Sequence, residues 1–379
     1  MKMILYGFIP FLLLLSGCAT NPVTGKSEFQ MMSEQEEIAL GIQEYPQQIQ
    51  LAGGPYLIDA ELEQYVNRVG QKLASESDRP HLPYEFTIVN DSSWNAWALP
   101  GGKIAINRGL LEALRNESEL AAVLGHEIVH AAARHSAQQM ERGMWMQAGL
   151  LGLTLAAGEE YQNAVYETGS MAAGVGMLKY SRDAESEADY YGMRYMKKTG
   201  YDPSGAVSLQ ELFADNMDSS GGWLASHPAS IDRVRQNQAS LKDLNNDGYL
   251  GSAEYRIYTR TLKDRAPAYD LYDQGQKALK NKQPQQALQL SLAARKLVKE
   301  EALFYGLSAE AYEQLGNRKA ALQAWDQAIR RNPEWFYFYL KRGMVNEQAG
   351  NRTEAAADFK SSYQLLATEE AKNGDNRNQ

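Results

Sequence analysis

The stretch SELAAVLGHEIVHAAARHSAQ, residues 118–138, combines an apolar helical pattern with three histidines and two glutamates. It contains the motif HExxH, in which His126 and His130 are four residues apart. On a helix, this spacing places both imidazoles on one face, so both can bind one metal ion. Glu127 lies beside them and can act as a general base toward water. The flanking residues are apolar, which predicts a core helix in which these polar groups are costly unless they are paired or metal-bound.

This motif supplies two ligands, whereas a catalytic zinc site usually has three protein ligands and one position for water. His135 follows His126 by nine residues, which places it about half a turn round the helix, on the opposite side. Ala133 is expected to continue the helix between them. We therefore interpret His135 as a surface or core residue.

A better source of the third ligand is the stretch SRDAESEADYYGMRYM, residues 181–196. Glu185 and Asp189 are four residues apart and share a helix face. We expect Glu185 to be the third ligand and Asp189 to accept a hydrogen bond from a ligand histidine, which fixes its tautomer. Glu187 lies about 200° away and is expected to face solvent. The alternative for Glu185 is a solvated helix charge, and spacing alone does not decide between the two.

The N-terminus, MKMILYGFIPFLLLLSGCAT, has the features of a secretory signal. Its apolar run is too short to span a bilayer, which needs about 20 residues. The segment LSGC resembles a bacterial lipobox, which implies cleavage before Cys18 and lipidation of that residue. Ala19 follows, and in Gram-negative lipoproteins this implies sorting to the outer membrane. The alternative is an ordinary signal peptide with an incidental cysteine, and with a single cysteine no intramolecular disulfide can form.

The rest of the pattern predicts a mainly α (α+β) protein. Helices are expected at about 59–77, 117–141 and 181–198, with strands at 84–90 and 103–106.

Alanines 287, 321 and 355 are 34 residues apart, and Trp325 and Phe359 repeat the same step. This period resembles that of tetratricopeptide (TPR) repeats, which implies an all-α solenoid that binds proteins. The net charge of −9 argues against a nucleic-acid partner.

The sequence contains HExxH, the later Ser181-Arg182-x-x-Glu185-x-x-Ala188-Asp189, and the stretches NAWALPGGKIAINRGLL and SHPASIDR. Together these four motifs resemble one family. It is the gluzincin family of the CAAX prenyl endopeptidases and HtpX, in particular its periplasmic lipoproteins with C-terminal TPR repeats. The resemblance implies one zinc ion on His126, His130 and Glu185, with Glu127 as general base. It also implies that Ala105 and its neighbours form an edge strand that aligns substrate by strand addition.

Two further residues match the later part of the family pattern, His227 and Arg233. In the family they lie near the active site, where they can stabilise the developing oxyanion. For the lipoprotein subgroup, the alternative is that the histidine caps the zinc and holds the enzyme latent. A third interpretation is that His227 belongs only to a His-Pro turn at a helix start.

The resemblance implies a lipid-anchored zinc metalloendopeptidase on the periplasmic face of the outer membrane, with misfolded or stalled envelope proteins as substrates. The rival interpretation is a chaperone or scaffold in which cleavage is rare.

We expect a signal peptide at 1–17, a tether and N-terminal helix at 18–50, a metallopeptidase domain at 51–240, a helical linker at 241–266, a TPR domain at 267–368 and a disordered tail at 369–379.

Two other segments carry open alternatives. The stretch DLNNDGYLGSAE, residues 243–254, matches the spacing of an EF-hand loop, but Asn-Asp-Gly is also common in turns, so a calcium site is one of two interpretations. Residues 143–178 are rich in Gly, Ala, Met and Leu. They are interpreted as a lid or membrane-facing hairpin, or else as a buried helix pair.

Overall fold

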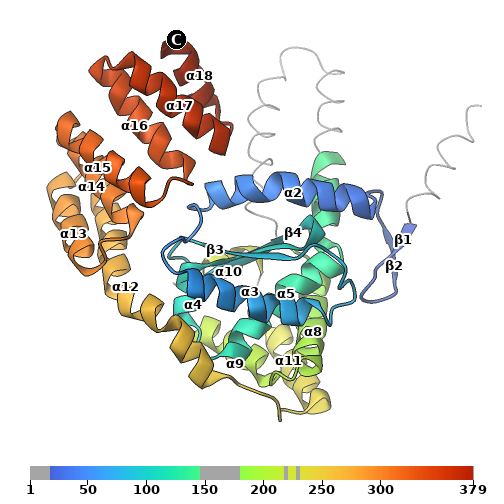
Figure 1. The fold of residues 1–379 in the computed structure, drawn as a ribbon. Helices are drawn as coiled ribbons and strands as arrows, with labels where there is room; N and C mark the ends of the chain where they lie inside the picture. The colour runs from blue at the N-terminus through green and yellow to red at the C-terminus, as the bar shows by residue number, and fades with distance from the viewer. Residues whose placement is uncertain (1–17, 146–179, 217–220, 228–230, 379) are drawn as a thin grey trace, which may run out of the picture.

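A computed structural model describes residues 18–145, 180–216, 221–227 and 231–378 (Figure 1). The predicted signal peptide at 1–17 and most of the segment at 143–178 lie outside these residues. The described part is mainly helical with two small sheets, which confirms the predicted fold class. Cys18–Thr20 (β1) pairs with Ser27–Phe29 (β2), and the chain then enters helix α2, Glu34–Leu51, through a Ser33–Glu36 capping box.

The second sheet lies between helix layers and has the order β3-β5-β4. Its strands are Glu85–Val89 (β3), Ala96–Leu99 (β4) and Lys103–Asn107 (β5), with the 3-10 turn η1, Pro100–Gly102, between the last two. Helix α2 covers one face, and α3 (Ala60–Ala74) and α5 (Glu117–Ala132) cover the other (Figure 1). The short α4, Arg108–Ala113, follows β5.

The sheet corrects one expectation, because Ala105 does not lie in an edge strand. It pairs with Thr87 of β3 on one side and with Trp97 of β4 on the other. The edge strand that adjoins the site is therefore β4. Every residue of β5 is buried, because neighbouring strands cover both of its edges and helices cover both faces of the sheet.

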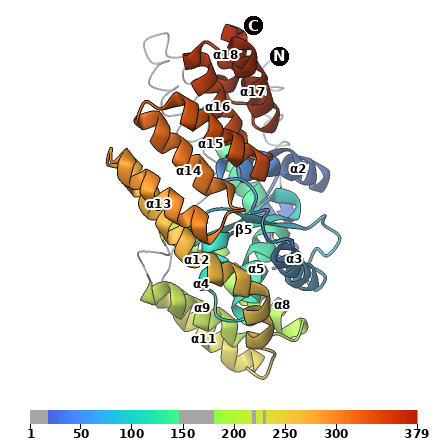
Figure 2. The ribbon, with the colours of Figure 1, turned by 60° about the vertical axis from the view of Figure 1, so that its left-hand side comes forward.

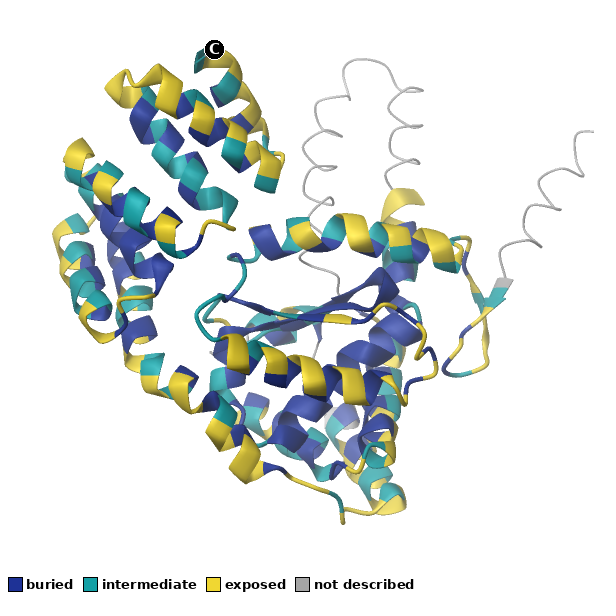
Figure 3. Cartoon of the chain, viewed as in Figure 1, coloured by how far each residue is buried: buried dark blue, intermediate teal, exposed yellow. Residues whose placement is uncertain are grey.

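Helix α5 is buried along its whole length and begins at Asn116, whose side chain accepts a hydrogen bond from the Glu119 backbone N–H. It crosses α8 (Arg182–Lys198) at two glycines. A Cβ atom on Gly192 would lie 3.1 Å from the backbone nitrogen of His126, and one on Gly125 would lie 3.3 Å from the Gly192 carbonyl oxygen. Larger residues would push the helices apart. The close approach places the α8 carboxylates next to the α5 histidines, and Figure 3 shows that α5 is buried.

Helix α5 ends at Ala132, and this corrects the expectation that Ala133 continues it. Arg134 follows with a φ of 66°, in the left-handed region that non-glycine residues rarely adopt. Its guanidinium holds this turn by hydrogen bonds to Glu37 (2.9 Å) and to the Met32 carbonyl (2.5 Å). The chain therefore changes direction just before His135.

Three further helices complete the domain: Ser204–Asp215 (α9), Gly221–Ser226 (α10) and Ile231–Leu244 (α11). The C-terminal part is a stack of antiparallel helices (Figure 2). Its helices are Ser252–Lys280 (α12), Pro284–Leu297 (α13), Ala302–Gln314 (α14), Arg318–Arg331 (α15), Phe336–Ala349 (α16), Arg352–Leu365 (α17) and Glu369–Asn378 (α18).

The repeat pattern is confirmed by burial, because the alanines and aromatics at the 34-residue step are completely covered: Ala287, Ala321, Ala355, Trp325 and Phe359. Two expectations about its ends are wrong. Residues 369–378 form α18, which packs on α17, with Ala371 buried and Gly374 against the Phe359 ring. The boundary between linker and repeats at 267 falls inside the continuous helix α12.

The repeat stack contacts the N-terminal domain through a short loop before α16. The Trp335 indole N–H donates to the Gln50 carbonyl (3.0 Å), and the Gln50 side-chain amide donates to the Glu334 carbonyl (2.6 Å). The Trp335 ring also lies against Gly54, where a Cβ atom would come within 2.8 Å of it. The C-terminal end of α2 is therefore fixed by the repeats.

Candidate metal centre

Four side chains from three parts of the chain converge at the α5–α8 crossing: His126, His130, Glu185 and His227. The first two come from α5, Glu185 comes from α8, and His227 directly follows α10. All four are buried, and one donor atom of each lies within 4.8 Å of the others. Among the residues that the structure describes, this is the one group of its kind. The structure thus brings together the three residues predicted as ligands and adds His227.

The spacing of the donors fits a zinc ion. Tetrahedral zinc with bonds of about 2.0–2.1 Å keeps its donor atoms roughly 3.3 Å apart. The Nε2 atoms of His126 and His130 are 3.0 Å apart, and His126 Nε2 is 3.2 Å from His227 Nδ1. The Glu185 oxygens lie 3.0 Å from His227 Nδ1, 3.5 Å from His130 Nε2 and 3.6 Å from His126 Nε2. Nitrogen and carboxylate donors are also the ligands that zinc takes in proteins.

Asp189 lies where the sequence predicted it, behind a candidate ligand. Its Oδ1 accepts a hydrogen bond from His126 Nδ1 at 3.0 Å, which leaves Nε2 of that ring facing the other donors. Arg233 binds the same carboxylate through two nitrogens, each at 2.8 Å, and reaches Glu185 Oε2 at 2.6 Å. Burial alone would raise the pKa of Asp189, but the Arg233 charge and the His126 hydrogen bond outweigh it and lower the pKa to about 2.

The pKa values of His130 and Glu185 favour binding of a cation. Burial holds the pKa of His130 well below its usual value, so this imidazole stays neutral. Burial would raise the pKa of Glu185, but the His227 charge and hydrogen bonds from His130 and His227 outweigh it, so the carboxyl stays ionised. A neutral imidazole and an ionised carboxylate are the forms that bind zinc.

Glu127 is completely buried next to this cluster. Its Oε1 lies 3.4 Å from His227 Nε2, and its Oε2 makes no hydrogen bond to any described residue. Burial raises the pKa of this carboxyl. A buried carboxyl with free lone pairs and a raised pKa is better suited than an exposed one to taking up and releasing a proton.

Two residues that lie beside the cluster were not predicted there. His135 is buried, in agreement with the core alternative, but it does not lie on the opposite side of the helix, because its Nδ1 is 3.0 Å from Nδ1 of His130. It also lies 3.4 Å from Glu187, which is half-buried instead of facing solvent as predicted. Tyr180 stacks on the His130 ring with centroids 3.7 Å apart. The sequence signal for Tyr180 is its position directly before the Ser-Arg motif that opens α8.

A cleft of about 340 Å³ borders the cluster on the side of the sheet. The edge strand β4 lines it with Trp97, Ala98 and Leu99, and the C-terminal end of α2 lines it with Gln48 and Leu51. His227 and Tyr180 also line it. The edge strand thus runs along a cleft that reaches His227, one of the candidate metal donors.

The interpretation of residues 243–254 as an EF-hand loop is not supported. The carboxylates of this loop form no candidate metal group among the described residues. Asp247 forms an ion pair with Lys197 instead, and Glu254 interacts with the Tyr249 side chain. Tyr249 also continues the backbone pairing with Tyr201, so the loop is used for packing.

The search for membrane-spanning helices covers the same part of the chain. Within the described residues, no helix is both long enough and apolar enough to cross a membrane.

Comparison with known sequences finds relatives of the N-terminal domain. The profile of peptidase family M48 matches residues 60–240. The beta-barrel assembly-enhancing protease of Yersinia pestis is 32% identical over 202 residues, which cover 51% of this chain and 41% of that protein. The protein of the same name from Escherichia coli K12 is 29% identical over 252 residues, covering 62% of this chain and 51% of the relative.

A third relative, the metalloprotease YcaL of Escherichia coli K12, is 32% identical over 154 residues, 40% of this chain and 60% of that protein. The chain thus spans about half the length of the curated relatives it matches. Among solved structures, the Arabidopsis OM64 TPR domain matches 31% of this chain and 97% of its own, at 27% identity and a TM-score of 0.30.

Proposed function

We propose that this chain is a zinc metalloendopeptidase, because the profile of peptidase family M48 matches residues 60–240. The observation that carries the proposal is the buried cluster of four donor atoms with zinc-like spacing, next to a buried glutamate that has a free oxygen. In this proposal His126, His130 and Glu185 hold one zinc ion. When bound, zinc supplies Lewis-acid chemistry that polarises a peptide carbonyl and makes water a better nucleophile at neutral pH.

Glu127 is proposed as the general base. It would take a proton from the attacking water as the new C–O bond forms, and then deliver that proton to the nitrogen of the departing amine as the peptide C–N bond breaks. Its position supports this role, because it is completely buried and its Oε2 has no hydrogen-bond partner among the described residues.

For His227 we favour the role of a latch over that of an oxyanion donor. Catalytic zinc keeps one position free, whereas four protein donors close the site. The His227 Nδ1 atom lies among the other donors, 3.0 Å from Glu185 and 3.2 Å from His126. Arg233 is already bound to Asp189 and Glu185, which supports a role in positioning these two carboxylates. Substrate entry would then require His227 to leave the cluster.

The proposed substrates are misfolded or stalled proteins of the bacterial envelope, including outer-membrane β-barrels. Two relatives are named as proteases that enhance β-barrel assembly, which supports this class. Clients of this kind offer unpaired strands, and the edge strand β4 borders the cleft where a substrate strand could be added. The repeat stack would recruit substrates or partners. The rival proposal is a chaperone or scaffold with minor proteolysis.

The deciding experiment is cleavage of an unfolded outer-membrane β-barrel protein by a soluble form that begins after Cys18. Wild type, Glu127→Gln and Glu354→Gln are compared at equal zinc content, because Glu354 is exposed on α17 and serves as the matched control. Cleavage that is lost only in Glu127→Gln supports the peptidase. If no form cleaves the client while all of them suppress its aggregation, the scaffold replaces the peptidase.

The proposed location is the periplasmic face of the outer membrane, held by a lipid on Cys18. The lipobox-like LSGC segment supports this proposal. Cys18→Ser should move the protein from the membrane fraction to the soluble fraction, as measured by fractionation. Retention of the variant in the membrane would refute lipid anchoring through this residue.

A further inference from the structure

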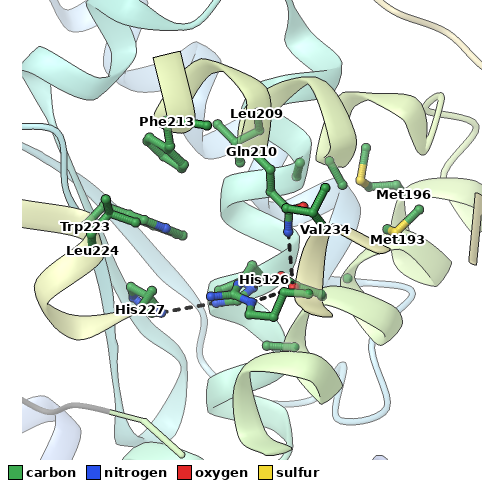
Figure 4. A pocket seen from close by; sticks show the side chains of 17 residues that line it. His126, Met193, Met196, Leu209, Gln210, Phe213, Trp223, Leu224, His227 and Val234 are labelled. Atoms are coloured by element: carbon green, nitrogen blue, oxygen red, sulfur yellow. Dashed lines mark hydrogen bonds and ion pairs between the residues drawn. The ribbon is translucent and has the colours of Figure 1, made fainter. Parts of the chain in front are cut away.

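The two α5 histidines of the proposed zinc site have different partners behind their rings. The Nε2 atom of His126 faces His227 at 3.2 Å (dashed in Figure 4), and its Nδ1 donates to Asp189. The Nε2 atom of His130 also faces the donors, 3.0 Å from His126 Nε2. Its Nδ1, however, lies 3.0 Å from Nδ1 of His135. An imidazole therefore stands behind His130, where a carboxylate stands behind His126.

The contact between His130 and His135 joins two ring nitrogens, so one of them must donate and the other must accept. His130 can offer the lone pair of Nε2 to a metal only if its own proton is on Nδ1. In that case His135 accepts through Nδ1 and carries its proton on Nε2. The reverse arrangement would point an N–H of His130 at the other donors. The tautomer of His135 therefore decides whether His130 can be a ligand.

Glu187 lies where it selects the required tautomer of His135. Its Oε1 is 3.4 Å from His135 Nε2, and the two side chains are only 13% and 7% exposed. An ionised carboxylate only accepts hydrogen bonds, so it favours the tautomer of His135 that carries its proton on Nε2. The carboxylate is itself held by Asn21, whose Nδ2 donates to the same oxygen at 3.0 Å.

Tyr180 fixes the plane of the His130 ring but cannot fix its tautomer. The two rings are stacked, with centroids 3.7 Å apart and planes at 19°. This stacking is the same whichever nitrogen of His130 carries the proton. It would also survive a 180° flip of the ring about the Cβ–Cγ bond, which exchanges the positions of nitrogen and carbon atoms. The polar contact with His135 at Nδ1 distinguishes these states, and stacking does not.

We propose that His135 and Glu187 are positioning residues for the zinc site. Glu187 holds the proton of His135 on Nε2, and His135 holds the proton of His130 on Nδ1, which leaves His130 Nε2 free for the metal. The inference deepens the proposed function and rests on the zinc site in it. It also gives the left-handed conformation of Arg134 a role, because the turn there carries His135 back to His130.

The first test compares two replacements of His135 in the full chain, purified in detergent. Asparagine can place a side-chain oxygen near the position of Nδ1, whereas leucine has a similar size but no acceptor. In competition with a chelator, His135→Leu should bind zinc about 10- to 100-fold more weakly than the wild type, and His135→Asn within about threefold of it. His81→Leu is the control, because His81 is exposed and lies outside the cluster.

The second test removes the group behind His135. Glu187→Ala should lower zinc affinity by about tenfold, because the proton of His135 is no longer held on Nε2. Asp183→Ala, at an exposed position of the same helix, is the matched control and should leave the affinity unchanged. This variant also carries the test if His135→Leu does not fold, as judged by circular dichroism.

The tautomer of His130 provides a readout that a merely structural role would not change. Proton–nitrogen correlation spectra of the metal-free protein, labelled with ¹⁵N-histidine, report which ring nitrogen carries the proton. The His130 signals are assigned by their loss in His130→Asn. The proton should be on Nδ1 in the wild type and in His135→Asn, whereas the form with the proton on Nε2 should appear in His135→Leu.

The outcomes separate this inference from the proposed function. A zinc affinity of His135→Leu within about twofold of the wild type overturns the inference, and so does an equal loss in His135→Asn and His135→Leu. An unchanged affinity in Glu187→Ala overturns the role of that residue. If the wild type binds no zinc, the proposed function fails. The spectra of the metal-free protein then decide: a tautomer of His130 that changes in His135→Leu supports the inference, and an unchanged one overturns it.

Discussion

Replacing Asp189 with asparagine tests the idea that this carboxylate organises the metal centre. The two side chains have the same shape, but asparagine is neutral and can accept hydrogen bonds through only one oxygen. In the wild type, both carboxylate oxygens accept, one from His126 and Arg233 and the other from Arg233 and Gln210. Asp189→Asn therefore leaves an N–H of Arg233 or His126 facing another donor.

The expected cost follows from the pKa of Asp189. Its pKa is lowered from 3.8 to about 2, which corresponds to about 2.4 kcal/mol of stabilisation by its partners. Breaking one side of a buried ion pair costs about 3–5 kcal/mol. We expect Asp189→Asn to lower the free energy of unfolding of the metal-free protein by roughly 2–4 kcal/mol. Zinc affinity should fall by about 10- to 100-fold, because the His126 ring is no longer held.

The assays are urea unfolding of the metal-free forms and competition of the zinc-bound forms with a chelator. Asp183→Asn, on an exposed position of the same helix, is the control. Because the folded pKa of Asp189 is depressed, its stabilisation is complete above about pH 4 and is lost as the pH falls toward 2. The difference between wild type and variant should therefore shrink over that range. A zinc affinity within twofold of wild type, or a stability difference equal to that of Asp183→Asn, would refute the reasoning.

The other predictions concern the latch, the metal and the repeats. His227→Ala should raise kcat/KM about tenfold or more, because it removes the fourth donor from the cluster. The variant no longer needs the conformational step in which His227 leaves the cluster, so a larger fraction of the protein can accept substrate. A fall in kcat/KM would instead support a catalytic role for His227. Chelation of zinc should destabilise the protein by about 4 kcal/mol relative to zinc at a thousand times its Kd, measured by urea unfolding, and an unchanged midpoint would contradict zinc binding. Trp335→Ala removes the indole hydrogen bond to Gln50 and the ring that covers Gly54. It should lower the unfolding free energy by roughly 2–4 kcal/mol and separate the urea transitions of the two domains, whereas a single unchanged transition would show that the loop is not needed for docking.

The features that depend on local spacing could be predicted from the sequence. A helix forces residues i and i+4 onto one face, so the spacing alone pairs His126 with His130, and likewise Glu185 with Asp189. The 34-residue period predicted the buried alanines of the repeats for the same reason, since each repeat is a local unit that packs on its neighbour.

The expectations that failed depend on contacts between distant segments. His135 reaches His130 only because Arg134 adopts a left-handed conformation, and the groups that hold it, Glu37 and the Met32 carbonyl, lie about 100 residues earlier in the chain. The sequence between His130 and His135 does not contain that information. The edge position of β4 is another such case, because it depends on which neighbours β5 pairs with on its two sides.

The sequence by itself determined which residues can act as metal donors and bases, and that a helical repeat stack follows them. Only the tertiary structure placed His227 in the buried group of four donors and in the wall of the cleft along β4. The physical reason is that chemical identity and helical spacing are local properties of the chain. Whether residues from distant segments meet in one site depends instead on how helices that are far apart in the sequence pack. Here that packing depends on the close approach of Gly125 and Gly192.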